Sequence, residues 1–344
     1  MKRIINNPED LVKEMIEGVV EANKHWLEII PGLNAMKKKK IKDKVIVMSN
    51  GGAGCEPMHI GYVGIGMGDA TCIGEIYTAP SAYTIYETVK AVYKGKGAIL
   101  ICANFMGDYL NTDMAVELLN LEGYRVEKIV VNDDLNVEPG ADPDKRGGTT
   151  GIIYVLKVLG AASEKGLELE ELVKLGNKVK NSVSTISVTL YSGSFPQTGE
   201  LMFEIPDDTI EFGMGFNGEP GIKSSKMLKA DEMVEIMFEH LKKDLELQNG
   251  DEVCSMVNSL GATTYMEQHI VFRKLAQLLK KEGVSIYDAK INRYHTSQEA
   301  GGVSITLLKL DEELKKYYNF PAVSPAFTHL PHNKQTVFQI RDFL

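Results

Sequence analysis

The stretch from Ser49 to Ser81 contains residue types that could bind a small ligand and act on it. It follows an apolar run at residues 45–48 and opens with small residues, namely Gly51, Gly52, Ala53 and Gly54. Glycines leave backbone N–H groups open to a ligand, and the positive end of a helix dipole behind them would strengthen binding. The pattern therefore indicates a buried strand, a glycine loop and the start of a helix. Such a segment either cradles a ligand or forms a tight strand-to-helix turn without one.

Two side chains in this stretch, Cys55 and His59, could take part in catalysis. A thiol at a helix N-terminus has a lowered pKa, which favours the reactive thiolate form. A small buried cysteine with a structural role is the alternative for Cys55. His59 follows four residues later and would share a helical face with Cys55, so that the two form a couple. A core or capping histidine is the other interpretation of His59.

Asp108 is a third candidate, in the segment NFMGD after an apolar run at residues 98–102. A carboxylate at the carboxyl end of a central parallel strand can act as a general base and take a proton from a hydroxyl nucleophile. An aspartate here would also serve as the N-cap of a helix, and a helical pattern follows at residues 111–121. The position alone leaves both roles open.

Three further polar groups fit either a ligand or an ordinary turn. Lys145 and Arg146 precede two glycines and a helical pattern, and they bind an anion or are solvated loop charges. Asp133 and Asp134 hold Mg²⁺ or end a strand in a turn. Asn217 lies in the loop GFNGEPG, where left-handed backbone geometry alone would explain it. The sequence contains no Walker A motif and no run of metal-ligand carboxylates, so we expect neither a nucleotide nor a metal on this chain.

The first half of the chain supplies a framework for these residues. Apolar strands at residues 45–48, 98–102 and 128–131 each end in polar residues, and helical patterns at residues 82–93 and 111–121 lie between them. This alternation predicts a largely parallel, doubly wound sheet. Ligands bind to such sheets at the carboxyl ends of the strands, where the polar residues lie. We therefore expect the ligand site at these strand ends.

Further elements are expected before and after that sheet. An amphipathic helix at residues 8–25 precedes a basic cluster at residues 37–40, which we interpret as a solvated loop. Helices at residues 149–165 and 168–182 follow the sheet. Beyond them we expect strands at residues 183–190, 209–214, 252–258 and 303–308 and helices at residues 233–245 and 266–282. We thus predict two α/β domains, 1–182 and 183–344, with the loop from Gly213 to Gly221 of the second contributing to the site.

Length, charge and cysteine content limit the class of protein. With 344 residues the chain is long enough for two domains. Its 38 basic and 47 acidic residues give a net charge of −9 without a long basic block, which argues against nucleic acid and membrane partners. The four scattered cysteines fit reduced thiols, and no run reaches ~18 apolar residues. We expect a cytoplasmic protein that acts on a small molecule.

Seven segments, in order along nearly the whole chain, resemble one known family. They are GGAGCEPMHIGYVGIGM, GEIYTAPSA, NFMGDYLN, KRGGTTG, EFGMGFNGEPGI, VNSLGATT and TSQEAGGVSITLLKL. The family is the substrate-binding subunit of the phosphotransferase-system-dependent dihydroxyacetone (glycerone) kinases. The resemblance implies two α/β domains, a homodimer formed through the second and a ketose pocket in the first. It also implies a separate ADP-bearing subunit as partner, with ADP and Mg²⁺ on that subunit and no cofactor on this chain.

The same resemblance implies that several pocket residues are altered. Asn217 stands at, or one position from, a family histidine that holds the ketose as a covalent hemiaminal, and an amide nitrogen is not nucleophilic. Cys55 stands where a second family histidine assists at the substrate oxygens, and Ala103 replaces a lysine near the substrate. Asp108 is retained as the catalytic residue. The implied substrate-binding residues are Gly51, Gly52, Ala53, Gly54, Cys55, Ala103, Asn217 and Gly218.

Two functions are consistent with this pattern. The first is phosphoryl transfer to a short ketose or a polyol, in which Asp108 deprotonates the terminal hydroxyl and the glycine-loop amides position the substrate. The second is a non-catalytic paralogue that senses a ligand and binds a partner protein such as a regulator. A third, weaker idea makes Cys55 the nucleophile, which would form a thiohemiketal with a carbonyl carbon.

Overall fold

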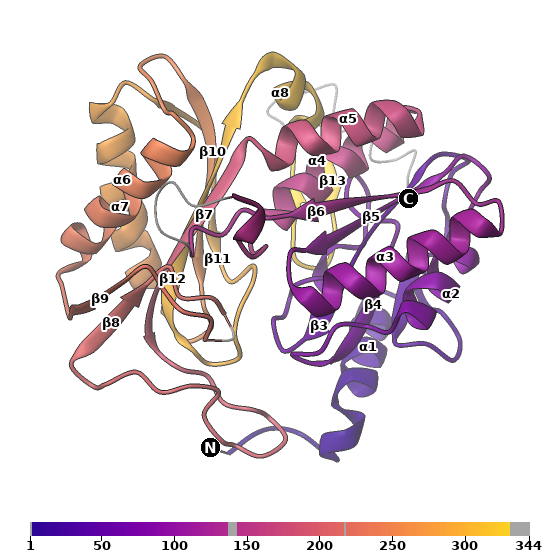
Figure 1. Ribbon diagram of the computed structural model, residues 1–344, viewed down its shortest axis with the longest axis horizontal. Helices are drawn as coiled ribbons and strands as arrows, with labels where there is room; N and C mark the ends of the chain where they lie inside the picture. Colours follow the sequence, from indigo (N-terminus) through magenta and orange to yellow (C-terminus); the bar gives the residue numbers. More distant parts are fainter. Residues whose placement is uncertain (1, 137–142, 217, 331–344) are drawn as a thin grey trace.

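The computed structural model describes residues 2–136, 143–216 and 218–330, and it contains two six-stranded sheets with helices packed on them (Figure 1). The first sheet has the strand order β1 (Leu27–Ile29), β2 (Ala35–Lys38), β4 (Ala70–Ile76), β3 (Ile46–Ala53), β5 (Ala98–Ala103) and β6 (Val126–Val131). Strands β4, β3, β5 and β6 are parallel, whereas β2 pairs antiparallel with both of its neighbours. The prediction of a largely parallel sheet is confirmed.

Alternating side chains of the central strands bury both faces of this sheet. The helices of this half are α1 (Leu11–Ala22), α2 (Ala82–Val92), α3 (Met106–Leu121), α4 (Ile152–Glu164) and α5 (Leu169–Lys180). Met48 and Leu100 share a core cluster with α2 and α3, while Val47 and Ile101 share another with α4 and α5. Successive residues of a strand point to opposite faces, so a doubly covered strand needs an unbroken apolar run. The sheet is therefore doubly wound, as the sequence predicts.

The second sheet is mostly antiparallel. Its order is β11 (Ser285–Asn292), β10 (Glu252–Ser259), β12 (Gly301–Leu310), β7 (Val183–Tyr191), β8 (Thr209–Phe212) and β9 (Lys223–Lys226). Only β10 and β11 are parallel to each other. Helices α6 (Ala230–Asp244) and α7 (Tyr265–Lys281) cover the face turned away from the first sheet (Figure 1). This half is the predicted second α/β unit.

Helix α4 lies at the centre of the molecule and is buried on all sides. Its core cluster takes Ile101 from the first sheet and Met256 and Leu308 from the second, so the two halves share one apolar core. A helix that is apolar all round must be enclosed in this way. Although α4 is apolar, no helix among the described residues is long enough and low enough in charge to cross a membrane.

The end of the described chain returns to the first half. After α8 (Glu312–Tyr318), the short strands β13 (Ala322–Val323) and β14 (Thr328–His329) form a hairpin. Backbone hydrogen bonds link Ile65 and Val323 in both directions, at 2.9 and 3.0 Å. All strands of the first sheet precede residue 182 and all strands of the second follow it. The returning segment follows residue 182 as well, but it packs on the first half. The domain division at residue 182 remains a prediction.

Only part of the basic cluster at residues 37–40 is the solvated loop that we expected, because Lys39 and Lys40 are exposed but Lys37 and Lys38 belong to β2. Lys38 ends strand β2 and is buried, with its Nζ 2.7 Å from Asp69 Oδ1 and 2.8 Å from Glu164 Oε1. Lys44 Nζ lies 2.6 Å from the other oxygen of Asp69. Buried charges persist only when they are paired, and no local sequence pattern indicates that these distant charges pair.

Two helix boundaries near the expected site also differ from the prediction. Strand β3 continues through the glycines to Ala53, and residues 54–59 form turns before a 3₁₀ helix, η2 (Ile60–Tyr62). No helix therefore begins behind Cys55. Helix α3 starts at Met106, so Asp108 lies in its first turn rather than at the N-cap, which is Phe105. Of the two roles that the sequence left open for Asp108, the N-cap role is excluded.

Candidate functional site

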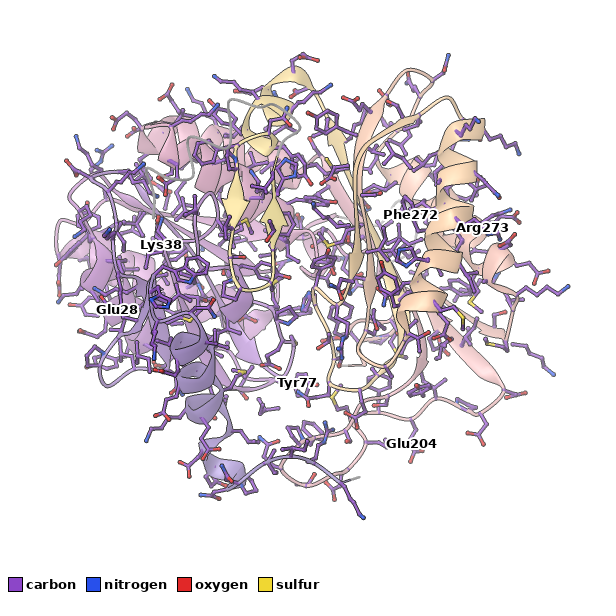
Figure 2. All side chains as sticks on the ribbon, turned by 180° about the vertical axis from the view of Figure 1, so that it is seen from behind. Glu28, Lys38, Tyr77, Glu204, Phe272 and Arg273 are labelled. Atoms are coloured by element: carbon purple, nitrogen blue, oxygen red, sulfur yellow. The ribbon has the colours of Figure 1, made fainter. Side chains whose placement is uncertain are left out.

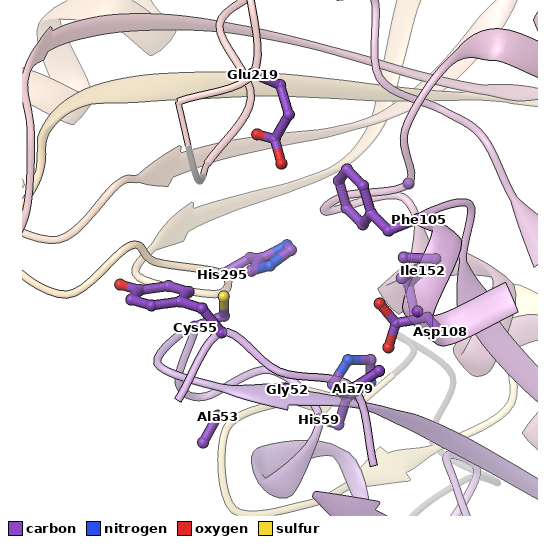
Figure 3. A pocket seen from close by; sticks show the side chains of 15 residues that line it. Gly52, Ala53, Cys55, His59, Ala79, Phe105, Asp108, Ile152, Glu219 and His295 are labelled. Carbon is purple, nitrogen blue, oxygen red and sulfur yellow. The ribbon is translucent and has the colours of Figure 1, made fainter. Parts of the chain in front are cut away.

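A cavity of about 200 Å³ lies at the carboxyl ends of β3 and β5, between the two halves of the chain (Figure 3). Tyr77, which lines the cavity, marks its place between the halves in Figure 2. The predicted site residues that line it are Gly51, Gly52, Ala53, Cys55, Ala103 and Asp108. Gly54 and Gly218 do not line it, and Asn217 lies outside the described residues. The structure thus brings together most of the predicted residues of the first half.

The glycines of β3 allow close packing around the cavity. A β-carbon on Gly51 would clash with the imidazole of His59, and one on Gly52 would lie 2.9 Å from the backbone nitrogen of Thr78. Gly54 has a φ of +101°, and its N–H donates to Glu56 Oε1 at 2.8 Å. Gly51 and Gly52 are needed because a side chain would meet close neighbours, and Gly54 is needed because its backbone is left-handed. A helix dipole plays no part here.

Asp108 presents a carboxyl group to the cavity from the first turn of α3. Burial raises its pKa to about 7, and only its own backbone N–H opposes that shift. Its Oδ1 atom has no hydrogen-bond partner among the described residues. A carboxyl group with a pKa near neutrality can accept a proton from a substrate hydroxyl and later release it.

The thiol of Cys55 does not have the lowered pKa that one of its two interpretations required, and its burial agrees with the other. Burial raises its pKa well above the usual value, and the carboxyl groups of Glu56, Asp108 and Glu219 add to this effect. The pKa is not lowered because no helix begins at this residue and because acidic side chains lie around it. All four cysteines are free thiols.

Two histidines, His59 and His295, face the cavity together. Burial lowers the pKa of His59 to about 4 and that of His295 well below the usual value, so both rings are neutral near pH 7. His59 shares the cavity with Cys55 but not a helical face. His295 comes from the loop after β11 and was missed, because a single histidine beside the segment TSQEAGG carries no signal of its own.

The second half also contributes Glu219, from the predicted loop between Gly213 and Gly221. The described residues that line the cavity include the carboxyl groups of Asp108 and Glu219 but no lysine or arginine. A cavity with acidic and neutral polar groups repels anions and suits an uncharged ligand that carries hydroxyl or carbonyl oxygens.

Two of the other candidate groups, Arg146 and Asp133, have structural partners. Arg146 Nη2 bonds Asp244 Oδ1 at 2.7 Å. Asp133 accepts hydrogen bonds from the N–H groups of Thr149 and Gly151, both at 2.7 Å, and so holds the start of α4. In the described part of the chain, no three His, Cys, Asp or Glu side chains are placed to hold a metal ion.

The fold and the cavity define an α/β protein with a small-molecule site at the carboxyl ends of a parallel sheet. Residues 17–326 match the Dak1 domain, and the chain belongs to the Dak1 domain family. A relative from Listeria innocua, the dihydroxyacetone-binding subunit DhaK of PTS-dependent dihydroxyacetone kinase 1, is 39% identical over 314 residues, which cover 91% of this chain and 95% of that protein. The resemblance that the seven segments predict is confirmed.

Two solved structures are similar over most of this chain. The dihydroxyacetone kinase operon co-activator Dha-DhaQ has a TM-score of 0.87 and 29% identity, covering 92% of this chain and 98% of that one. The dihydroxyacetone kinase of C. freundii has a TM-score of 0.87 and 26% identity, covering 97% of this chain and 61% of that one. A kinase and a co-activator therefore share this fold.

Proposed function

We propose that this chain is the substrate-binding subunit of a cytoplasmic phosphotransferase that acts on a short ketose or a polyol. The phosphoryl donor is carried by a separate ADP-bearing subunit, which also supplies the ADP and Mg²⁺. One observation carries this proposal, namely a buried carboxyl group, Asp108, with a pKa of about 7 in a cavity that suits an uncharged ligand.

Asp108 has the properties of the base that this reaction needs. Its carboxylate takes the proton of the terminal hydroxyl while the hydroxyl oxygen attacks the incoming phosphorus. Phosphoryl transfer depends mainly on positioning and on charge stabilisation, so a single well-placed carboxylate can support it. If Asn217 stands where the family resemblance places it, no covalent anchor selects for ketones, and polyols such as glycerol become substrates too.

A coupled assay with the cognate ADP-bearing subunit tests the proposal. Dihydroxyacetone, erythrulose and glycerol are offered, and Asp108→Asn is expected to lower kcat by about a hundredfold or more. Asp231→Asn is the matched control, because Asp231 also lies in the first turn of a helix but far from the cavity. No turnover of any of these compounds, or equal turnover by Asp108→Asn and the wild type, would refute the proposal.

The exposed face of α3 supports docking of the donor-bearing partner beside the cavity. Met106, Leu110, Met114 and Leu118 are exposed at every fourth position. Residues four apart line one side of a helix, and exposed apolar stripes of this kind favour protein contacts. The stripe begins at the N-terminal end of α3, which is also the end that carries Asp108.

A positive charge placed in this apolar stripe tests the docking surface. Leu110→Lys is expected to weaken binding of the ADP-bearing subunit about tenfold while ketose binding is kept. Met266→Lys on the exposed side of α7 is the control. Unchanged binding by Leu110→Lys would place the partner elsewhere. The homodimer that the family resemblance implies is a separate proposal, which sedimentation of the chain alone tests.

The alternative function is that of a ligand sensor, and the similarity to the co-activator structure favours it. A sensor needs affinity for a ligand and for a regulator but no turnover. Pull-down from the native organism separates the two functions. Recovery of a transcription regulator, with a ligand bound and no turnover, supports the sensor, whereas recovery of a kinase-type partner alone supports the phosphotransferase.

A further inference from the structure

His59 and His295 are both almost fully buried, yet one nitrogen of each ring has no hydrogen-bond partner in the described part of the chain. Their exposed fractions are 5% and 6%, and the Nδ1 atom of each ring has no partner among the described residues. Buried polar atoms in native proteins nearly always have a partner, so two such rings in one cavity call for an explanation. Figure 3 shows the two rings facing the same space, one from each half of the chain.

The position of His295 is tightly fixed by its surroundings. The buried amide of Asn258 accepts from the backbone N–H of His295 at 2.9 Å and donates to its carbonyl at 2.7 Å. The ring stands edge-on to Phe216 with the centroids 4.4 Å apart. A side chain whose backbone and ring are both held is preorganised for binding, because little conformational freedom remains to be lost.

The next residue ties this loop to the turn that carries Cys55. Thr296 donates its backbone N–H to the carbonyl of Cys55 at 3.2 Å and its hydroxyl to the carbonyl of Glu56 at 2.7 Å. His295 is therefore a fixed part of the cavity wall.

We propose that His295, together with His59, binds oxygen atoms of the ligand and makes the cavity selective for uncharged polyhydroxylated compounds. A neutral imidazole has one N–H donor and one nitrogen acceptor, and a hydroxyl group likewise donates and accepts. The phosphate group of a phosphate ester mainly accepts hydrogen bonds, and it carries a negative charge that Asp108 and Glu219 repel. This inference rests on the ligand-binding part of the proposed function and not on phosphoryl transfer.

The wild-type chain provides the first test, with its histidine rings labelled with ¹⁵N. Ring nitrogen signals are recorded during titration with dihydroxyacetone and then with glycerol 3-phosphate. We expect dihydroxyacetone to shift the signals of His295 and His59 and to leave that of His269 in place, because His269 lies on α7 and does not line the cavity. Glycerol 3-phosphate is expected to shift none of the three.

Variants provide the second test through the dissociation constant for dihydroxyacetone. His295→Leu is expected to weaken binding about tenfold, which corresponds to the loss of one hydrogen bond. His295→Gln keeps a donor and an acceptor and is expected to stay within about threefold of the wild type. His269→Leu, the matched control, is expected to bind like the wild type, and circular dichroism checks that each variant folds.

Three outcomes would overturn the inference. They are no binding of dihydroxyacetone by the wild type, binding without a shift of the His295 signal, and equal affinity of folded His295→Leu and the wild type. Histidine shifts with no phosphoryl transfer in the coupled assay would refute the proposed function and leave this inference standing.

Discussion

Asp108 combines two properties that can be tested separately. Burial raises its pKa to about 7, so the carboxylate that acts as base forms only as the pH passes this value. We expect kcat/KM to rise with pH through about 7 and to level off above it, as measured in the coupled assay. A rate that is flat between pH 6 and 8 would contradict the assigned role.

The same shift affects stability. A carboxyl group ionises near pH 4 in the unfolded chain but near pH 7 here, so between these values the folded state holds a proton that the unfolded state has lost. Rising pH therefore destabilises the fold through this group. Asp108→Asn cannot ionise, and we expect it to raise the free energy of unfolding at pH 8 on the order of 2 kcal/mol, with little change at pH 4. Urea unfolding at both pH values measures this, and a decrease at pH 8 would contradict it.

Cys55 should be a slow nucleophile in spite of its place in the cavity. Its raised pKa leaves very little thiolate at pH 7.5, and only the thiolate reacts with alkylating reagents. We expect iodoacetamide to modify Cys55 in the folded chain at least tenfold more slowly than in the urea-unfolded chain, roughly as the loss of thiolate dictates. Peptide mass spectrometry measures both rates. Fast labelling that dihydroxyacetone suppresses would instead revive Cys55 as the nucleophile.

At the scale of elements, a buried ionic cluster joins the edge of the first sheet to α4. Asp69 bonds Lys38 and Lys44, which hold its pKa down at about 2, and Glu164 from the end of α4 also bonds Lys38. Removing one partner leaves buried charge uncompensated, which typically costs 3–5 kcal/mol. We expect Asp69→Asn to lower the free energy of unfolding at pH 7 by about this amount.

An exposed ion pair in the same half is the control that shows how much of the effect depends on burial. Lys90 and Glu122 form an exposed pair, and Glu122→Gln is expected to lower the free energy of unfolding far less than Asp69→Asn does. Since the pKa of Asp69 is lowered, its stabilisation is complete above pH 4 and is lost as the pH falls towards 2. Urea titrations of both variants at pH 7 check the difference, and equal costs would show that the cluster contributes no more than a surface pair.

The elements that the sequence predicted well are those with a continuous apolar pattern. Strands β5 and β6 and helices α2, α4 and α5 lie close to the predicted ranges. The strands were predictable because a strand buried on both faces must be apolar throughout. Strand β2 was missed because its buried lysine, Lys38, is neutralised by Asp69 and Glu164, which are distant in sequence. Ion pairs between residues so far apart leave no pattern in the sequence around β2.

At the scale of the whole molecule, the site also combines residues that local sequence patterns predict and residues that only distant packing brings in. The first half supplies Asp108, Cys55 and the glycines, which were predictable because local spacing places them at strand ends. Glu219 and His295 reach the cavity only through the packing of the second half. The family resemblance pointed to the loop that holds Glu219, and nothing in the sequence pointed to His295.

The N-terminal segment also acts across the molecule. Arg3 donates from Nη1 to Gln298 at 3.1 Å and from Nη2 to the hydroxyl of Ser194 at 2.7 Å, and it pairs with Glu299 at 2.5 Å. Gln298 has a φ of +51°, an unfavourable value for a residue with a side chain, and its N–H bonds the carbonyl of Gly54. Arg3 therefore holds a strained loop that begins three residues after His295.

We expect Arg3→Ala to loosen that loop without unfolding the chain. The lost charge-assisted hydrogen bonds are half-buried, so the free energy of unfolding should fall by about 1–2 kcal/mol. Amide hydrogen exchange of residues 294–300 should become faster, and dihydroxyacetone should bind more weakly, because His295 is less well held. Lys2→Ala, which removes a neighbouring charge, is the control. Exchange in this segment as slow as in the wild type would mean that Asn258 and Thr296 fix the loop without help from the N-terminal segment.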